Sequence, residues 1–169
     1  MLKNKNMSIP QKVIKFLAKR EAKYEPIKHR TVYTAYDKAA TLRVPQKIVG
    51  KTLVVKLGKN LALVLIPANK NLDKDKLKKT AHPLCGYPKK VDFVSERIIK
   101  NKLKGVKVGA VPPFGSLWKI TTFADRGLIK NKKIIVSGGD YNWSIKISSN
   151  NLKKIVPDLV FGNFGKAKK

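Results

Sequence analysis

Acidic side chains are scarce in this sequence of 169 residues. It has ten Asp and Glu residues against 38 Lys and Arg residues, which gives a net charge of +28. Only five of the basic residues are arginines, so 33 are lysines. The acids are scattered, and no two have the spacing of a general acid and a general base. A surface of such one-sided charge attracts polyanions.

Cysteine and histidine are nearly absent as well. Cys85 is the single cysteine, and His29 and His82 are the two histidines. One cysteine cannot form an internal disulfide, and these three residues do not make a zinc pattern. A cysteine nucleophile needs an adjacent base, and the neighbours of Cys85 supply none. We therefore expect no metal, no cofactor and no hydrolase triad.

Long hydrophobic runs are missing too. The longest ones, such as Leu61–Pro67, are far shorter than the roughly 20 residues of a membrane-spanning helix. The first twelve residues contain no apolar core of a signal peptide. We expect a soluble, cytoplasmic protein with no membrane partner.

The chain does contain enough hydrophobic residues, 43%, for one core. We predict a single domain over residues 1–169, with loose basic tails at residues 1–6 and 165–169.

Hydrophobic periodicity, caps and turn residues predict the helices and strands of this domain. Helices are expected over 8–22 (with a capping box at Ser8), 34–42 (capped by Thr34), 71–79 and 95–105 (capped by Ser95), and after a cap at Asn150 or Asn151. Strands are expected over 24–32, 48–57, 61–67, 118–124, 133–137 and 143–148. This order predicts an α+β fold with a mixed, mainly antiparallel, barrel-like sheet and short surrounding helices.

Lys51 stands out among the lysines because of its strand neighbours. Side chains alternate along a strand, so Lys51 shares a face with Val49, Leu53, Val55 and Leu57, which are all apolar. It is either a strand-end lysine that extends its ammonium to water or a half-buried ammonium at the mouth of a pocket. The pattern alone leaves both interpretations open.

Two glycine-containing loops can likewise be interpreted either as structural turns or as parts of a binding site. The segment from Val108 to Gly115 is either a rigid turn anchored by Phe114 or a loop that presents fixed backbone amides to an oxyanion or a water. The segment from Ser137 to Asp140 is either a hairpin turn or a second pocket wall. His29 is more often a structural hydrogen-bonding group than a catalyst in such a position.

The order of these motifs resembles a known family. The motifs are Tyr24-Glu25 with His29, Thr34 with Ala39-Ala40, Ile48 to Val55, Leu63 to Pro67, Gly109 to Gly115, and Ser137-Gly138-Gly139. In this order they resemble the YbaK-like aminoacyl-tRNA editing domains, which include free-standing deacylases and the editing insertion of bacterial prolyl-tRNA synthetases. The resemblance covers roughly residues 13–157.

The resemblance implies a hydrolase, a trans-editing deacylase that cleaves the ester bond of mischarged tRNA and so supports translation fidelity. By position, Lys51 resembles the lysine that positions the tRNA 3′ end, and Gly109 resembles the loop glycine that holds the scissile ester or the attacking water; we take these two as catalytic. The implied substrate-binding residues are His29, Ala110, Val111, Pro112, Phe114, Gly115, Ser137, Gly138 and Gly139. The implied partners are tRNA and an aminoacyl-tRNA synthetase, without metal or cofactor.

Two alternatives remain open at this level. One is a non-catalytic RNA-binding module of the same fold, whose lysines contact phosphates without sequence preference. The other is a solvated lysine-rich surface with no specific partner. The edited amino acid also stays open among alanine, serine, threonine and cysteine, because selection among small side chains rests on one or two groups.

Overall fold

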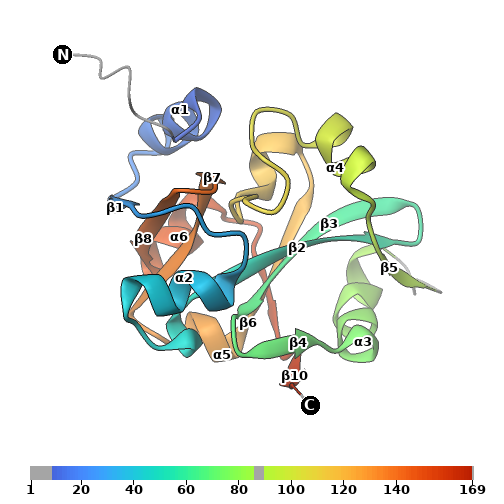
Figure 1. The fold of residues 1–169 in the computed structure, drawn as a ribbon. Helices are drawn as coiled ribbons and strands as arrows, with labels where there is room; N and C mark the ends of the chain where they lie inside the picture. The colour runs from blue at the N-terminus through green and yellow to red at the C-terminus, as the bar shows by residue number, and fades with distance from the viewer. Residues whose placement is uncertain (1–8, 86–89, 169) are drawn as a thin grey trace.

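A hairpin of two long strands runs through the centre of the fold (Figure 1). The computed structural model describes residues 9–85 and 90–168. The hairpin strands are β2 (Gly50–Leu57) and β3 (Asn60–Pro67), paired antiparallel as predicted. Gly58 occupies the turn with a φ of 63°, a backbone conformation that glycine adopts readily.

The hairpin belongs to a five-stranded sheet with the order β5-β2-β3-β6-β9. Its other strands are β5 (Val91–Phe93), β6 (Thr121–Asp125) and β9 (Val160–Gly162). The β3–β6 and β6–β9 pairs are parallel, and the remaining pairs are antiparallel.

Two antiparallel sheets complete the described strands. The first has the order β1-β8-β7 and comprises β1 (Tyr24–Lys28), β8 (Trp143–Ser148) and β7 (Lys133–Asp140). The second pairs β4 (Lys70–Leu72) with β10 (Gly165–Ala167). The prediction of a mixed, mainly antiparallel α+β fold is confirmed, and the barrel-like arrangement consists of separate open sheets.

Short helices surround these sheets. They are α1 (Gln11–Lys19), α2 (Ala35–Leu42), α3 (Lys74–Cys85), α4 (Glu96–Lys102), α5 (Arg126–Ile129) and α6 (Ser149–Ile155), with 3-10 turns η1 (Gln46–Ile48) and η2 (Gly115–Trp118). Thr34 and Ser95 cap α2 and α4 as predicted, because each hydroxyl accepts a hydrogen bond from a backbone N–H three residues on. No helix within the described ranges has both the length and the apolar character needed to cross a bilayer.

Several predicted boundaries are wrong. Helix α6 is capped by Ser148, not by Asn150 or Asn151, because the extended backbone at the end of β8 lets the Ser148 hydroxyl accept from the Asn151 N–H at 3.0 Å. Helix α3 begins after Asp73, whose carboxylate accepts from the Lys76 N–H at 3.2 Å, and continues to Cys85.

The two chain ends differ from the predictions in different ways. The capping residue proposed for the first helix, Ser8, and the proposed tail 1–6 lie outside the described residues, and Pro10 immediately precedes α1. The proposed tail at 165–169 is not loose over Gly165–Ala167, because these residues pair with β4 and the Gly165 N–H donates to Asp125 at 2.6 Å.

The two larger sheets meet between β7 and the residue that precedes β2. An isolated parallel bridge joins Val49 to Ile135 at this point. Both residues are buried in a small cluster with Ala39 of α2 and Ala68. Helix α2 therefore covers the junction of the sheets, and this junction frames the site described next.

Candidate functional site

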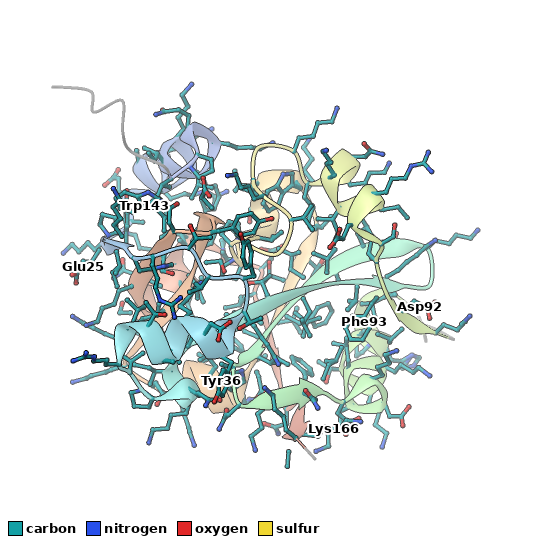
Figure 2. The ribbon with its side chains drawn as sticks, in the orientation of Figure 1. Glu25, Tyr36, Asp92, Phe93, Trp143 and Lys166 are labelled. Carbon is teal, nitrogen blue, oxygen red and sulfur yellow. The ribbon has the colours of Figure 1, made fainter. Side chains whose placement is uncertain are left out.

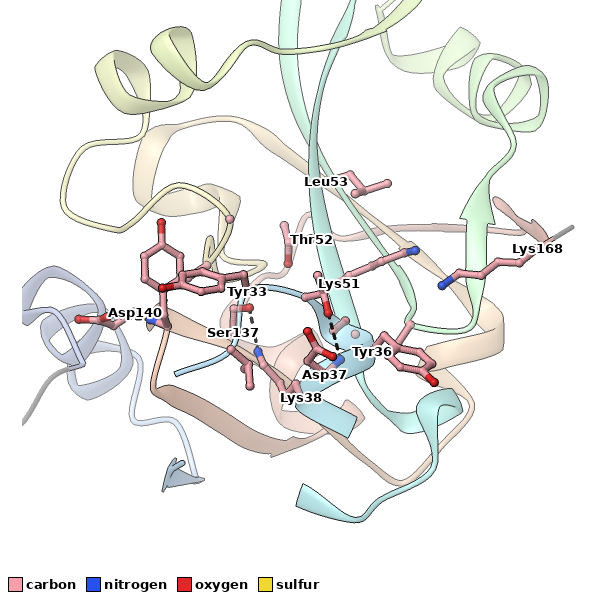
Figure 3. A pocket seen from close by; sticks show the side chains of 18 residues that line it. Tyr33, Tyr36, Asp37, Lys38, Lys51, Thr52, Leu53, Ser137, Asp140 and Lys168 are labelled. Atoms are coloured by element: carbon pink, nitrogen blue, oxygen red, sulfur yellow. Dashed lines mark hydrogen bonds between the residues drawn. The ribbon is translucent and has the colours of Figure 1, made fainter. Parts of the chain in front are cut away.

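A cavity of about 650 Å³ lies at this junction, between α2, the start of β2 and the end of β7 (Figure 3). Its lining comes from segments that are far apart in the sequence. The lining residues are Val32, Tyr33, Thr34, Ala35, Tyr36, Asp37, Lys38, Gly50, Lys51, Thr52, Leu53, Ala68, Gly109, Ala110, Ser137, Asp140, Tyr141 and Lys168.

Strand register brings two predicted site residues to the same level of the cavity. The bridge pairs Val49 with Ile135, and the two strands run parallel there. Lys51 and Ser137 each follow two residues later, so each side chain lies on the same face of its strand as the bridged residue before it. Both residues line the cavity. The register thus brings the strand lysine and the Ser-Gly-Gly segment into one site.

The environment of Lys51 differs from that of a surface lysine. Its side chain is half-buried in the cavity wall, and Figure 3 shows it extending toward the side chain of Lys168. Burial lowers the pKa of Lys51, and the nearby charge of Lys168 lowers it further. The charge of Lys168 thus disfavours the charged form of Lys51, and an anion bound between the two side chains would relieve this repulsion.

The glycine-proline loop reaches the cavity with its first two predicted residues. Gly109 has a φ of 87°, which favours glycine, and Ala110 follows with its N–H bonded to Lys107 O at 3.0 Å. Tyr141 braces the loop, because its hydroxyl donates to Val108 O at 2.5 Å. The loop backbone is therefore held against the cavity.

The other four predicted residues of this loop do not line the cavity. Val111 is buried among apolar side chains from β2, β3 and the end of α4, and Pro112 is buried beside it. Phe114 stacks on Phe16 at 5.4 Å between ring centroids, so it is the anchor considered from sequence. Gly115 donates its N–H to Thr122 Oγ1 at 2.9 Å, and a Cβ there would meet Ile120 O.

The Ser-Gly-Gly segment is not the turn of its hairpin. The ladder between β7 and β8 shifts register between Ser137 and Asp140, so Gly138 and Gly139 form a bulge, and the chain reverses afterwards. Gly139 has a φ of 100° and packs against Pro10. Of these residues, Ser137 and Asp140 line the cavity, whereas Gly138 and Gly139 do not.

His29 lies beside the site rather than in its lining. Its Nδ1 lies 2.8 Å from Arg30 O, which can only accept, so Nδ1 donates and Nε2 accepts from the Ser144 hydroxyl at 2.8 Å. Burial lowers the pKa of His29, and the charge of Lys38 adds to this effect against the opposing Arg30 hydrogen bond.

Lys38 is one of several cavity residues that sequence reasoning missed, and it is the most deeply buried lysine among them. It is only 6% exposed, and its Nζ lies 3.0 Å from Ser137 Oγ. Burial lowers its pKa to about 8. A signal was present, because Ala35, Lys38, Ala39 and Leu42 follow the i, i+3, i+4, i+7 spacing of a buried helix face.

Two tyrosines at the cavity are unusually exposed. Tyr33 is 68% and Tyr36 is 57% exposed. Tyr33 is fixed by an edge contact with Tyr141 at 4.9 Å between centroids. Thr52 adds a buried hydroxyl for which the described part of the chain supplies no hydrogen-bond partner. Within the same residues, no three His, Cys, Asp or Glu side chains gather as a metal site.

Comparison with known proteins agrees with this architecture. The model of the aminoacyl-tRNA editing domain family matches residues 29–155. Among solved structures, a hypothetical protein is 25% identical, with a TM-score of 0.78 over 92% of this chain and 100% of that one. A protein proposed as a trans-editing enzyme for prolyl tRNA synthetase is 20% identical, with a TM-score of 0.75 over 95% and 99% of the two chains. No curated protein matches. Because the family match covers most of the residues, the chain belongs to the aminoacyl-tRNA editing domain family.

Proposed function

We propose that this protein is a trans-editing deacylase that hydrolyses the ester bond of mischarged aminoacyl-tRNA. The observation that carries the proposal is the half-buried Lys51 in the wall of a cavity, in a chain of the editing family. We also propose that the protein acts in the cytoplasm, with tRNA and an aminoacyl-tRNA synthetase as partners.

The lysine pair suits the terminal phosphate of the tRNA. Lys51 and Lys168 are close enough for their charges to interact, and the described residues form no salt bridge with either. A phosphate oxygen between them stabilises both ammonium groups, each of which acts as a point charge. Binding there would direct the aminoacylated 3′ end into the cavity.

The braced backbone at Gly109 and Ala110 suits the reacting ester. An aminoacyl ester is already activated, so much of the rate enhancement can come from orienting the carbonyl and the attacking group. The positive φ of Gly109 and the Tyr141 brace fix this backbone before substrate arrives. The loop therefore acts as a preformed surface for the ester.

The exposed tyrosines suit the unpaired bases next to that ester. Aromatic rings stack on bases of single-stranded RNA without strict sequence preference. Tyr33 and Tyr36 present such rings at the cavity. The remaining positive charge, carried by lysines spread along the whole sequence and seen around the outline of the molecule in Figure 2, would raise the rate of encounter with tRNA.

The test is deacylation of a panel of mischarged tRNAs carrying alanine, serine, threonine or cysteine. We expect Lys51→Ala to lower kcat/KM by about 10- to 100-fold, mainly through KM, because it removes a hydrogen bond between two charged groups that contributes about 1.5–3 kcal/mol. Lys56→Ala is the matched control, because Lys56 lies on the same strand with its side chain exposed. It should stay within about twofold of wild type.

The same assay identifies the alternative. RNA binding that weakens with salt, is unchanged by Lys51→Ala and occurs without hydrolysis of any panel member would overturn the deacylase proposal and favour a non-catalytic RNA-binding module. Thermal melts of each variant show whether lost activity reflects lost folding.

A further inference from the structure

We propose that Ser137 and Lys38 form a serine–lysine catalytic pair, in which Ser137 Oγ attacks a carbonyl carbon and the Lys38 amine accepts the hydroxyl proton. The inference rests on the proposed function for its substrate, an aminoacyl ester. It adds to that function a nucleophile and a base contributed by the protein.

The first support is geometric. Lys38 Nζ and Ser137 Oγ are 3.0 Å apart, within the range expected for a nucleophile and its base (Figure 3). The two residues are 99 positions apart in sequence, and each sits on a regular element, α2 and β7. Both line the cavity that holds Lys51 and Gly109. The pair is thus preformed at the proposed ester site.

The second support is the electrostatic environment of the amine. The described residues provide no ion pair for Lys38, although Asp37 precedes it on α2 and Asp140 lies at the end of β7. His29 faces it from the segment after β1. Lys51 and Lys168, the other lysines of the cavity, add positive charge. Desolvation without a carboxylate is the condition that makes a lysine available as a base.

Burial also sets the fraction of Lys38 that is neutral. Its pKa of about 8 leaves roughly one tenth of the amine unprotonated at pH 7 and half at pH 8. An ordinary lysine has less than about 0.1% neutral amine at pH 7. A substantial share of the pairs therefore has a neutral amine at neutral and slightly alkaline pH.

The reaction balances without a co-reactant other than water. Ser137 Oγ forms a bond to the ester carbon while its proton moves to Lys38 Nζ. The carbon–oxygen bond to the ribose then breaks, and the ribose oxygen takes the proton from Lys38. Water attacks the acyl-serine, Lys38 accepts a water proton, and the proton returns to Ser137 Oγ as the amino acid leaves.

A second buried serine provides an internal comparison. Ser144 lies directly opposite Ser137 in the β7–β8 ladder. Its hydroxyl is bonded to the ring of His29, and it does not line the cavity. Ser144 therefore has burial and strand position in common with Ser137 but lacks both the lysine and the access to substrate.

The pair can be tested without tRNA by an alkyl fluorophosphonate, which phosphonylates activated serines and releases fluoride. The full chain is incubated with the probe, and the labelled peptide is identified by mass spectrometry. We expect label on Ser137 in wild type and in Ser144→Ala, and none at this position in Ser137→Ala. We expect labelling at least about 100-fold slower in Lys38→Met, with a wild-type rate that rises with pH around pH 8.

Two results would overturn the pair. One is an unlabelled Ser137 in folded wild-type protein at pH 9, under conditions that label a known serine hydrolase. The other is equal labelling rates in wild type and Lys38→Met, since Lys38 would then not act as the base. Deacylation assays on the same variants test the proposed function separately, because probe labelling requires neither tRNA nor Lys51.

Discussion

Lys51 and Lys38 line the same cavity, and both lose contact with water there, but they have opposite kinds of neighbour. Lys51 on β2 extends toward a second ammonium, that of Lys168. Lys38 on α2 meets a hydroxyl, that of Ser137. Burial lowers the pKa of both lysines.

The neighbour decides what each lysine can do. A pair of ammonium groups stabilises a bound anion and has no proton acceptor of its own. An amine beside a hydroxyl can take a proton from it once the amine is neutral. The comparison therefore divides the cavity into a side that we propose to bind phosphate and a side that we propose to carry out the chemistry.

The largest expected effect separates these two roles in steady-state kinetics. Lys38→Met should lower kcat for deacylation by about 100- to 10,000-fold with little change in KM, because it removes a general base. Lys51→Met should act mainly through KM and should reduce the dependence of affinity on salt, because it removes a phosphate contact. Michaelis–Menten measurements at two salt concentrations distinguish the variants.

If Lys38→Met and Lys51→Met changed the same kinetic parameter by the same factor, the two lysines could not have the different roles proposed here. Lys56→Met controls for the loss of one positive charge on β2 and should change neither parameter by more than about twofold.

The two lysines also differ in how visible they are in the sequence. Lys51 interrupts a strand whose face is otherwise apolar, so alternation alone identifies it. Lys38 lies in a short helix of small residues, where a lysine is usually solvated. Its partner is 99 residues away, and no local pattern predicts that contact. The helix spacing identifies the buried face but not the hydroxyl that Lys38 meets.

The same limit applies to the glycine-rich loops. Their positions in the chain could be predicted, because glycine and proline mark turns locally. Which of their residues face the cavity depends on packing. Phe114 and Val111 are drawn into the core by their apolar side chains, whereas Gly109 and Ser137 stay at the cavity. The predicted substrate-binding set was therefore wider than the cavity lining.

The next largest effect is on stability, and we expect Lys38→Met to be more stable than wild type. Native Lys38 has a pKa of about 8, against 10.5 when unfolded, so protonated Lys38 costs on the order of 3 kcal/mol of folding free energy at neutral pH. Methionine removes that cost. We expect a higher free energy of unfolding for the variant in urea titrations.

The stability difference between Lys38→Met and wild type should also depend on pH in a definite direction. The native pKa lies below the unfolded one, so the cost is fully present below pH 8 and disappears as the pH rises toward 10.5. The stability difference between Lys38→Met and wild type should shrink over that window. A difference that is constant from pH 7 to 10.5 would mean that packing, rather than charge, causes it.

Smaller effects are expected from the tyrosines beside both lysines. Tyr36→Ala should weaken binding of a single-stranded RNA ending in the tRNA 3′ sequence by roughly 5- to 100-fold, because a stacked base contributes about 1–3 kcal/mol. Phe93→Ala is a matched control, since Phe93 is also 57% exposed, lies on β5 and does not line the cavity (Figure 2).

The readout is the fluorescence of 2-aminopurine in place of the terminal adenine, which stacking quenches. Tyr36→Phe should restore quenching if the ring alone is needed. Equal loss in Phe93→Ala and Tyr36→Ala would show that binding follows general surface aromaticity and not this cavity.

The smallest effect should come from His29, which is close to Lys38 but does not line the cavity. Its lowered pKa keeps the ring neutral at pH 7, and its hydrogen bonds go to Ser144 and Arg30 O rather than to the pair. His29→Gln should cost about 1 kcal/mol of stability and change kcat by less than about threefold. Because the native pKa is below the unfolded value, wild-type stability should also fall as the pH drops through 6.5, and the variant should lose this dependence. A loss of kcat as large as that of Lys38→Met would instead make His29 part of the proton transfer, so that this side of the cavity would act as a three-residue system.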